Sequence, residues 1–225
     1  MEIIAHIHNV YTGKFGIPRQ SGLADTVESR IVFEKAYARE EAFRGLEGFS
    51  HLWILWEFSE NTERGWSLTV RPPKLGGNAR VGVFATRSPF RPNPIGLSCV
   101  QLKSILHTEN GVELVVTGAD LMDGTPVYDI KPYVPYTDAH PEALSGFVPE
   151  PESIMLKVEK YEDYPASMSE GAIHTLEAIL AQDPRPAYQQ DPERVYGMSY
   201  DHWNVKFRVT DGTVYIVDIE KEEDQ

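Results

Sequence analysis

The succession of short strand-like segments along the first part of the chain constrains the fold more than any other feature of the sequence. Apolar or alternating runs that favour strands cover residues 3–10, 28–33, 48–58, 81–85, 97–106, 112–118 and 127–133. The Asn110-Gly111 pair is typical of a tight hairpin turn, and residues 38–44 predict a short helix that ends at Gly45. We therefore predict a mainly β fold, with a β-barrel or a strongly curved mixed sheet in place of a βαβ succession.

The last third of the chain has a different character. Prolines mark a linker between Thr137 and Pro165, after which Ser169 is typical of the N-cap of a helix ending near Gln182. Residues 202–209 alternate as a strand should, and Asp211-Gly212 predicts a turn into a second strand ending near residue 219. We predict two domains, a barrel-like domain at residues 1–145 and a small α+β domain, a helix plus a hairpin, at residues 151–225. The outward face of the hairpin is either a patch for a partner or a solvated surface, and its residues are His202, Asn204, Lys206 and Arg208.

Length and composition indicate a folded protein without a membrane anchor or an internal disulfide. With 225 residues, 41% of them hydrophobic, the chain can bury a substantial core. No apolar run approaches the length that spans a bilayer, and residues 1–13 lack the basic start of a signal peptide. The single cysteine, Cys99, lies in an apolar run and is interpreted as a small core residue. We expect a cytoplasmic protein.

Several common catalytic and cofactor motifs are missing from the sequence. No GxGxxG follows a strand, no P-loop is present, and no serine lies in a GxSxG elbow, so a Rossmann-type cofactor site is not expected. The seven histidines are scattered, without HxxxH or CxxC spacing, so we expect no metal. His51, in the aromatic run at residues 48–58, is either a core histidine with satisfied hydrogen bonds or a ligand or base.

The segment at residues 71–98 is rich in proline and glycine and carries only basic charges. From Arg64 to Thr108 the chain has seven Lys or Arg residues and no Asp or Glu, although the whole protein has a net charge of −13. Such a segment either forms a binding site for phosphate, carboxylate or nucleic acid, or is a solvated basic face that pairs with acidic neighbours.

Four segments resemble the TrmO family, also known as the TsaA-like group. They are residues 18–22, 45–53, 71–98 and 123–133, and within the third the stretch FATRSPFRPNPIGL at residues 84–97 is highly specific. Residues 183–188 and 196–203 resemble the second domain of the bacterial members, so the resemblance covers nearly the whole chain. It implies a homodimeric, S-adenosylmethionine-dependent tRNA methyltransferase built on a β-barrel, with no membrane or metal involved. Its expected substrate is N6 of threonylcarbamoyladenosine at position 37, beside the anticodon, in threonine tRNA.

The family pattern also implies which residues hold the cofactor. The expected cofactor-binding residues are Pro18, Arg19, Gln20, Ser59, Glu60, Arg87, Leu97, Asp120, Leu121, Met122, Asp123, Gly124 and Thr125. Substrate contacts, to tRNA phosphates or to the threonyl carboxylate, are expected from Arg71, Lys74, Arg80 and Arg91, with Asn93 as a further substrate-binding residue.

The acceptor nitrogen is a poor nucleophile until its proton leaves, because it lies between an adenine ring and a carbonyl. We hypothesise that Asp129 or a substrate carboxylate assists that loss, with Lys131 near the threonyl carboxylate. A structural ion pair between Asp129 and Lys131 is the alternative.

Two other functions stay open at the level of sequence. A non-catalytic module that binds nucleic acid or small anions would need the basic segment but no cofactor. A hydrolase built on His51 and Ser88 is the third possibility. Binding of S-adenosylmethionine separates the methyltransferase from both.

Overall fold

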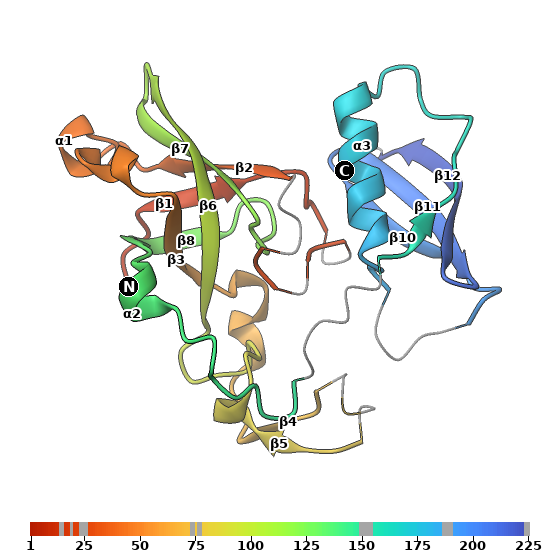
Figure 1. Cartoon of the computed structure of the whole chain (residues 1–225), viewed down its shortest axis with the longest axis horizontal. Coiled ribbons are helices and arrows are strands. Elements are labelled where there is room, and N and C mark those ends of the chain that lie inside the picture. Colours follow the sequence, from red (N-terminus) through yellow and green to blue (C-terminus); the bar gives the residue numbers. More distant parts are fainter. Residues whose placement is uncertain are drawn as a thin grey trace.

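A computed structural model describes residues 1–13, 16–18, 20–22, 27–72, 75, 78–148, 155–185 and 191–222, with backbone only at 62–64. It has two parts, a strand-rich N-terminal part and a smaller C-terminal part that carries the longest helix (Figure 1). Between them runs the chain that follows the first strand (Figure 1).

Six antiparallel strands close into a barrel in the N-terminal part, in the order β1-β2-β7-β6-β3-β8. Their bounds are Ala5–His8 for β1, Glu28–Phe33 for β2, His51–Glu57 for β3, Ile95–Thr108 for β6, Gly111–Thr117 for β7 and Pro126–Pro132 for β8. Successive residues of a strand face opposite sides, so Leu52, Ile54 and Trp56 of β3 are buried while the residues between them are half-buried. The predicted mainly β class and the barrel are confirmed.

Some predicted strands differ from the observed ones at their ends. The run at 3–10 forms a strand only as β1, because Asn9 turns the chain by accepting a hydrogen bond from the Tyr11 backbone N–H at 2.9 Å. The run at 81–85 stops after β5 (Val81–Gly82), because a 3-10 turn follows in which the Val83 carbonyl accepts bonds from the Thr86 N–H and hydroxyl. The run at 48–58 is shorter as β3, and the run at 97–106 is longer as β6.

The remaining elements of the N-terminal part are short. β5 pairs with β4 (Thr69–Val70) in a separate two-stranded sheet. The predicted helix at 38–44 is reduced to the single turn of α1 (Glu40–Phe43), and Gly45 follows it with φ +90°, a conformation that favours glycine. A second single turn, α2 (Pro135–Asp138), leads into the predicted linker.

The C-terminal part is a four-stranded sheet, in the order β10-β11-β12-β9, packed against one helix. The strands are β9 (Lys157–Val158), β10 (Tyr196–Tyr200), β11 (Trp203–Thr210) and β12 (Thr213–Lys221), and the helix is α3 (Glu170–Ala181). The predicted N-cap is confirmed, since the Ser169 hydroxyl accepts a hydrogen bond from the Ala172 N–H at 3.2 Å. The predicted hairpin is confirmed too, whereas β9 and β10 were not predicted.

On the outward face of the hairpin, Lys206 forms ion pairs with Asp218 at 3.1 Å and Glu220 at 2.7 Å. Its charge is therefore matched within the same sheet, which favours the solvated surface over a patch for a partner.

Two clusters of buried apolar residues fill the two parts. The first lies inside the barrel, and the second lies between α3 and the C-terminal sheet. The second cluster also includes Tyr11 and Val27 from the N-terminal part, so the two parts are joined by apolar packing. The division at 1–145 and 151–225 stays a prediction. Within the described ranges, no helix is long and apolar enough to cross a bilayer.

Candidate functional site

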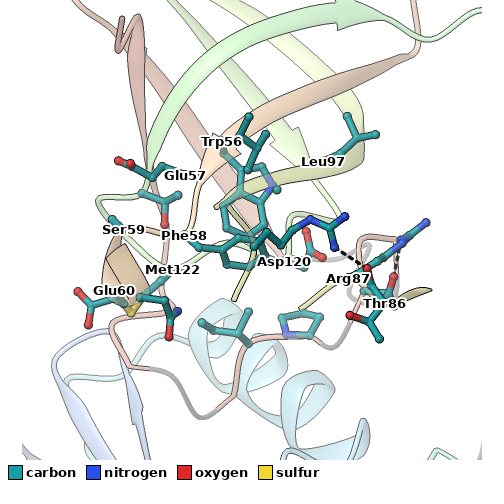
Figure 2. Close-up of a pocket in the computed structure, with 18 residues that line it drawn as sticks. Trp56, Glu57, Phe58, Ser59, Glu60, Thr86, Arg87, Leu97, Asp120 and Met122 are labelled. Carbon is teal, nitrogen blue, oxygen red and sulfur yellow. Dashed lines mark hydrogen bonds between the residues drawn. The ribbon is translucent and has the colours of Figure 1, made fainter. Parts of the chain in front are cut away.

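A pocket of about 550 Å³ opens at one end of the barrel (Figure 2). Because β3 and β6 are antiparallel, the end of β3 and the start of β6 meet at this end. The start of a 3-10 helix at 59–61, loop residues within 86–91 and 120–125, and residues 17, 18 and 20 complete the wall. The described lining residues are Ile17, Pro18, Gln20, Trp56, Glu57, Phe58, Ser59, Glu60, Asn61, Thr86, Arg87, Arg91, Ile95, Gly96, Leu97, Asp120, Met122 and Thr125. The volume lies within the range of small-molecule pockets, about 300–1,000 Å³.

An indole ring and a phenyl ring form the apolar wall. The rings of Trp56 and Phe58 pack with centroids 4.3 Å apart at 58°. Trp56 lies against Gly96, its cross-strand neighbour on β6, so closely that a Cβ on Gly96 would come within 2.1 Å of the indole. Only glycine therefore allows the indole to lie flat at this position, and the pocket has a fixed aromatic wall.

A chain of hydrogen bonds links the indole to a partly buried carboxylate. The indole N–H of Trp56 donates to the Ser98 hydroxyl at 2.9 Å, and that hydroxyl donates to a carboxylate oxygen of Asp120. Ser98 is fully buried, and its hydroxyl bonds to both groups. Burial raises the pKa of Asp120, while the hydrogen bond from Ser98 and the charge of Arg87 lower it.

Opposite charges lie on opposite sides of the pocket. Figure 2 shows Glu57 and Glu60 on one side and Arg87 on the other, with Asp120 between them. The Arg87 guanidinium donates to the Gln20 side-chain carbonyl at 2.6 Å, which joins two of the loops. Such an arrangement suits a ligand that carries both a positive and a negative group.

Arg91 also lines the pocket, but it serves the loop that carries Arg87. Its guanidinium donates to the backbone carbonyls of Val83 at 3.2 Å and Thr86 at 2.7 Å. It also lies over the Phe84 ring, 5.6 Å from the centroid. Arg91 therefore holds residues 83–86 in place.

Most of the expected cofactor-binding residues come together in this pocket. The lining includes Pro18, Gln20, Ser59, Glu60, Arg87, Leu97, Asp120, Met122 and Thr125. Leu121, Asp123 and Gly124 do not line it and instead shape its turn: Leu121 is buried in the barrel core, Asp123 accepts a hydrogen bond from the Asn9 N–H, and Gly124 has φ +74°. Arg19 lies outside the described residues.

The residues expected to meet the tRNA and the acceptor are more dispersed. Lys131 and Asp129 form an ion pair at 2.8 Å on β8, and neither lines the pocket. Arg80 donates to the Thr69 hydroxyl at 2.8 Å on the β4–β5 sheet, and Arg71 and Asn93 are exposed. Lys74 lies outside the described residues.

Sequence reasoning missed several lining residues, above all Trp56, Glu57 and Phe58. They end the aromatic run that predicts a buried strand, and in that context they were interpreted as core. A signal was available, because these residues directly precede the expected Ser59-Glu60 site. Gly96 was missed because the need for glycine arises only from the cross-strand indole.

Two further features of the described residues bear on the hydrolase alternative and on metal binding. His51 bonds through Nδ1 to the neighbouring Ser50 hydroxyl at 2.9 Å, and the Ser88 hydroxyl accepts a bond from the Phe90 N–H at 3.4 Å. Each is thus engaged by its own neighbours in the chain. No group of three or more His, Cys, Asp or Glu residues is placed to hold a metal ion in the described part of the chain.

Comparison with known families gives two matches that together span most of the chain. The tRNA-methyltransferase O N-terminal domain matches residues 6–139, and the TrmO C-terminal domain matches residues 151–222.

Individual relatives and solved structures agree with these matches. A tRNA (adenine(37)-N6)-methyltransferase of Escherichia coli is 44% identical over 225 residues, covering 93% of each chain. One of Eikenella corrodens is 50% identical over 168 residues, covering 75% of this chain and 95% of the relative. A crystal structure of TrmO superposes with a TM-score of 0.77 at 35% identity over 96% of each chain. TrmO from Pseudomonas aeruginosa gives 0.76 at 33% identity over 97% of each chain. The chain therefore belongs to the tRNA-methyltransferase O family.

Proposed function

We propose that this protein transfers a methyl group from S-adenosylmethionine to N6 of the adenosine at position 37 of tRNA. The observation that carries the proposal is the near full-length relative of Escherichia coli that is named for this reaction. The pocket at the end of the barrel supports it independently, because its size and its chemistry suit the cofactor.

The lining residues fit the parts of the cofactor. Apolar rings such as those of Trp56 and Phe58 stack on a planar base, and partly buried carboxylates such as Asp120 accept hydrogen bonds from hydroxyl or amino groups. Arg87 supplies a positive charge for the cofactor carboxylate, while Glu60 lies on the opposite side. S-adenosylmethionine supplies an electrophilic methyl group on a sulfonium cation.

The protein then contributes to the transfer mainly by orienting the methyl donor and the acceptor. Holding acceptor and donor in line can contribute about 7–11 kcal/mol to lowering a barrier. The fixed indole, the Ser98–Asp120 hydrogen bond and the Arg87–Gln20 bond make the pocket suited to this task, because each restricts a wall residue.

We propose threonylcarbamoyladenosine in threonine tRNA as the acceptor. The basic segment from Arg64 to Thr108 supports a polyanionic partner, with Arg71, Lys74, Arg80, Arg91 and Asn93 as its contacts. Each phosphate contact that is removed should lower the salt slope of tRNA binding by roughly one.

Asp129 and Lys131 have two candidate roles, catalysis at the acceptor nitrogen and a structural ion pair. Their 2.8 Å ion pair accords with the structural alternative, and a proton acceptor would need to reach the acceptor nitrogen from outside the pocket lining. Replacing Asp129 with asparagine separates the two interpretations. A catalytic Asp129 requires methyl transfer to fall about a hundredfold or more, the low end for loss of an acid–base group, whereas a structural pair leaves the rate nearly unchanged.

A homodimer and a cytoplasmic location complete the proposal. Sedimentation of the purified protein tests the first, and fractionation of cells tests the second.

The test is a methyl-transfer assay with labelled S-adenosylmethionine, using threonine tRNA with and without the threonylcarbamoyl group. Label on the modified tRNA alone supports both the reaction and the acceptor, and label on both tRNAs contradicts the proposed acceptor. No label on either tRNA, with no cofactor bound, favours a non-catalytic nucleic-acid or anion-binding module. Replacing Arg87 with alanine should abolish transfer, and full activity in that variant would refute its assignment to the site.

A further inference from the structure

All the described residues that line the pocket precede residue 126, but a segment near the start of the chain contacts both the pocket and the C-terminal part. We call its described residues, 10–13 and 16–18, the strap. Figure 2 shows the helix of the C-terminal part next to the pocket, on the side where the strap runs. The strap is therefore a candidate for transmitting an effect of the C-terminal part to the ligand.

On its outer side the strap is fixed to β10 and to the residue that follows it. The Asp201 N–H donates to the Val10 carbonyl at 2.9 Å, and the Thr12 hydroxyl donates to the Asp201 carbonyl at 2.9 Å. Further along, a Cβ on Gly13 would lie 3.1 Å from the Ser199 Cβ, so the two backbones are closely apposed.

The tightest side-chain support comes at Gly16. Gly16 has φ +92°, and a Cβ built on it would lie 3.3 Å from the Met198 sulfur and 3.8 Å from a methyl group of Ile179. The thioether of Met198, which is 3% exposed, thus fills the space beside the strap where a side chain would otherwise lie.

On its inner side the strap forms part of the pocket. Ile17 and Pro18 line the pocket, and Ile17 also packs against the second apolar cluster, which contains Met198. The Tyr11 carbonyl accepts a hydrogen bond at 2.9 Å from the Asp123 N–H, in the turn that carries Asp120 and Thr125. A shift of the strap would therefore move two walls of the pocket together.

We propose that Met198 is a positioning residue for the pocket ligand: it sets the place of the strap, and through it the place of residues 17–18 and 120–125. The C-terminal part then acts on ligand binding without touching the ligand. The inference depends on the proposed function only for the identity of that ligand, S-adenosylmethionine.

The first experiment compares Met198→Ala with Met168→Ala and Met198→Leu in the full chain. Met168 belongs to the same apolar cluster and is 7% exposed, but it precedes α3 and lies outside β10, so it controls for loss of packing. The readouts are the dissociation constant of S-adenosylmethionine by calorimetry, the urea midpoint, and the hydrogen exchange of residues 120–125 in the protein without ligand. A misplacement of about 1 Å can cost an enzyme about a hundredfold in reaction rate, so a small shift of the pocket wall should be measurable.

We expect Met198→Ala to weaken cofactor binding about tenfold or more and to speed exchange in residues 120–125. Met168→Ala should change the dissociation constant less than about twofold at a similar shift of the urea midpoint, and Met198→Leu should restore binding. Equal effects of the two alanine variants, or no effect of either, would overturn the proposal, because Met198 would then contribute only packing.

A second pair of variants moves the strap without opening a cavity, in case Met198→Ala does not fold. Gly13→Ala places a methyl group against Ser199, and Ser199→Gly removes both of the atoms that it would meet most closely. Gly13→Ala should weaken binding and speed exchange at residues 120–125, and Gly13→Ala with Ser199→Gly should recover most of the loss. Absence of recovery would contradict the strap as the route.

The exchange readout keeps this inference separate from the proposed function. If the unaltered protein binds no S-adenosylmethionine, the proposed function fails, whereas faster exchange at residues 120–125 in Met198→Ala alone still supports the strap. Unchanged exchange in a protein that does bind the cofactor overturns the strap and leaves the function intact.

Discussion

Replacing Ser98 with alanine removes one hydroxyl that serves the buried Trp56 and the partly buried Asp120. The indole N–H of Trp56 loses its acceptor, and one oxygen of Asp120 loses a donor. A buried polar group left without its partner costs about 1–3 kcal/mol. Asp120 keeps hydrogen bonds from its own backbone and from that of Ser21. The cost of removing the Ser98 hydrogen bond from Asp120 therefore lies at the low end of that range. We expect the free energy of unfolding to fall by about 2–4 kcal/mol at pH 7.

The same substitution should change how stability depends on pH. Burial raises the pKa of Asp120 above its usual 3.8, so the folded state holds this proton more tightly than the unfolded chain does. The free energy of unfolding therefore falls as the pH rises from about 4 through the folded pKa, and the penalty is complete above it. Ser98 lowers that pKa, so its removal enlarges the penalty at neutral pH. The loss in Ser98→Ala should be larger at pH 7 than at pH 4.

The assay is urea unfolding at both pH values, with Ser104→Ala as the matched control. Ser104 lies on the same strand but is exposed, so its replacement should change the free energy of unfolding by less than about 0.5 kcal/mol. When both proteins carry Asp120→Asn, the loss caused by Ser98→Ala should be the same at the two pH values. A loss below about 1 kcal/mol at pH 7, or a larger loss at pH 4, would refute the reasoning.

Three further substitutions test separate parts of the structure. Gly96→Ala should displace the Trp56 indole, lower the free energy of unfolding by about 3 kcal/mol or more, and weaken cofactor binding. Unchanged cofactor binding would show that the indole is no part of the site. Tyr11→Phe should leave the free energy of unfolding unchanged or raise it by up to about 1 kcal/mol, because the buried Tyr11 hydroxyl has no hydrogen-bond partner among the described residues. A lower free energy of unfolding in urea would mean that a partner exists. Ser169→Ala should cost about 1 kcal/mol through loss of the cap on α3, and no loss in thermal unfolding would contradict the capping role.

The sequence was most informative where a local pattern decides the structure. The alternation at residues 28–33 corresponds to β2, and Asn110-Gly111 marks the hairpin between β6 and β7, because side-chain period and turn chemistry are local. The short β9 was not predicted, since it is a two-residue strand that exists only through its parallel pairing with β12. β10 was missed because Gly197 and Ser199 weaken its strand signal.

In the functional site, too, some residues could be predicted from the sequence and some contacts could not. Arg87 and Asp120 could be placed from the family motifs, but their electrostatic coupling and the fixed indole depend on contacts between strands far apart in the chain. The support of the strap by Met198 connects residues more than 180 positions apart, and no local pattern indicates it.

A crystal structure of the protein with S-adenosylmethionine is the most direct test of the central claim, that the pocket at the end of the barrel is the cofactor site. We expect the bound cofactor against Trp56 and Phe58, with Asp120 within hydrogen-bond distance of one of its polar groups. A second cavity of about 650 Å³ is lined by residues of α1 and β6, with Phe43 and Leu102 among them. An ordered cofactor in that cavity, or one out of contact with Asp120 and Arg87, would contradict the account.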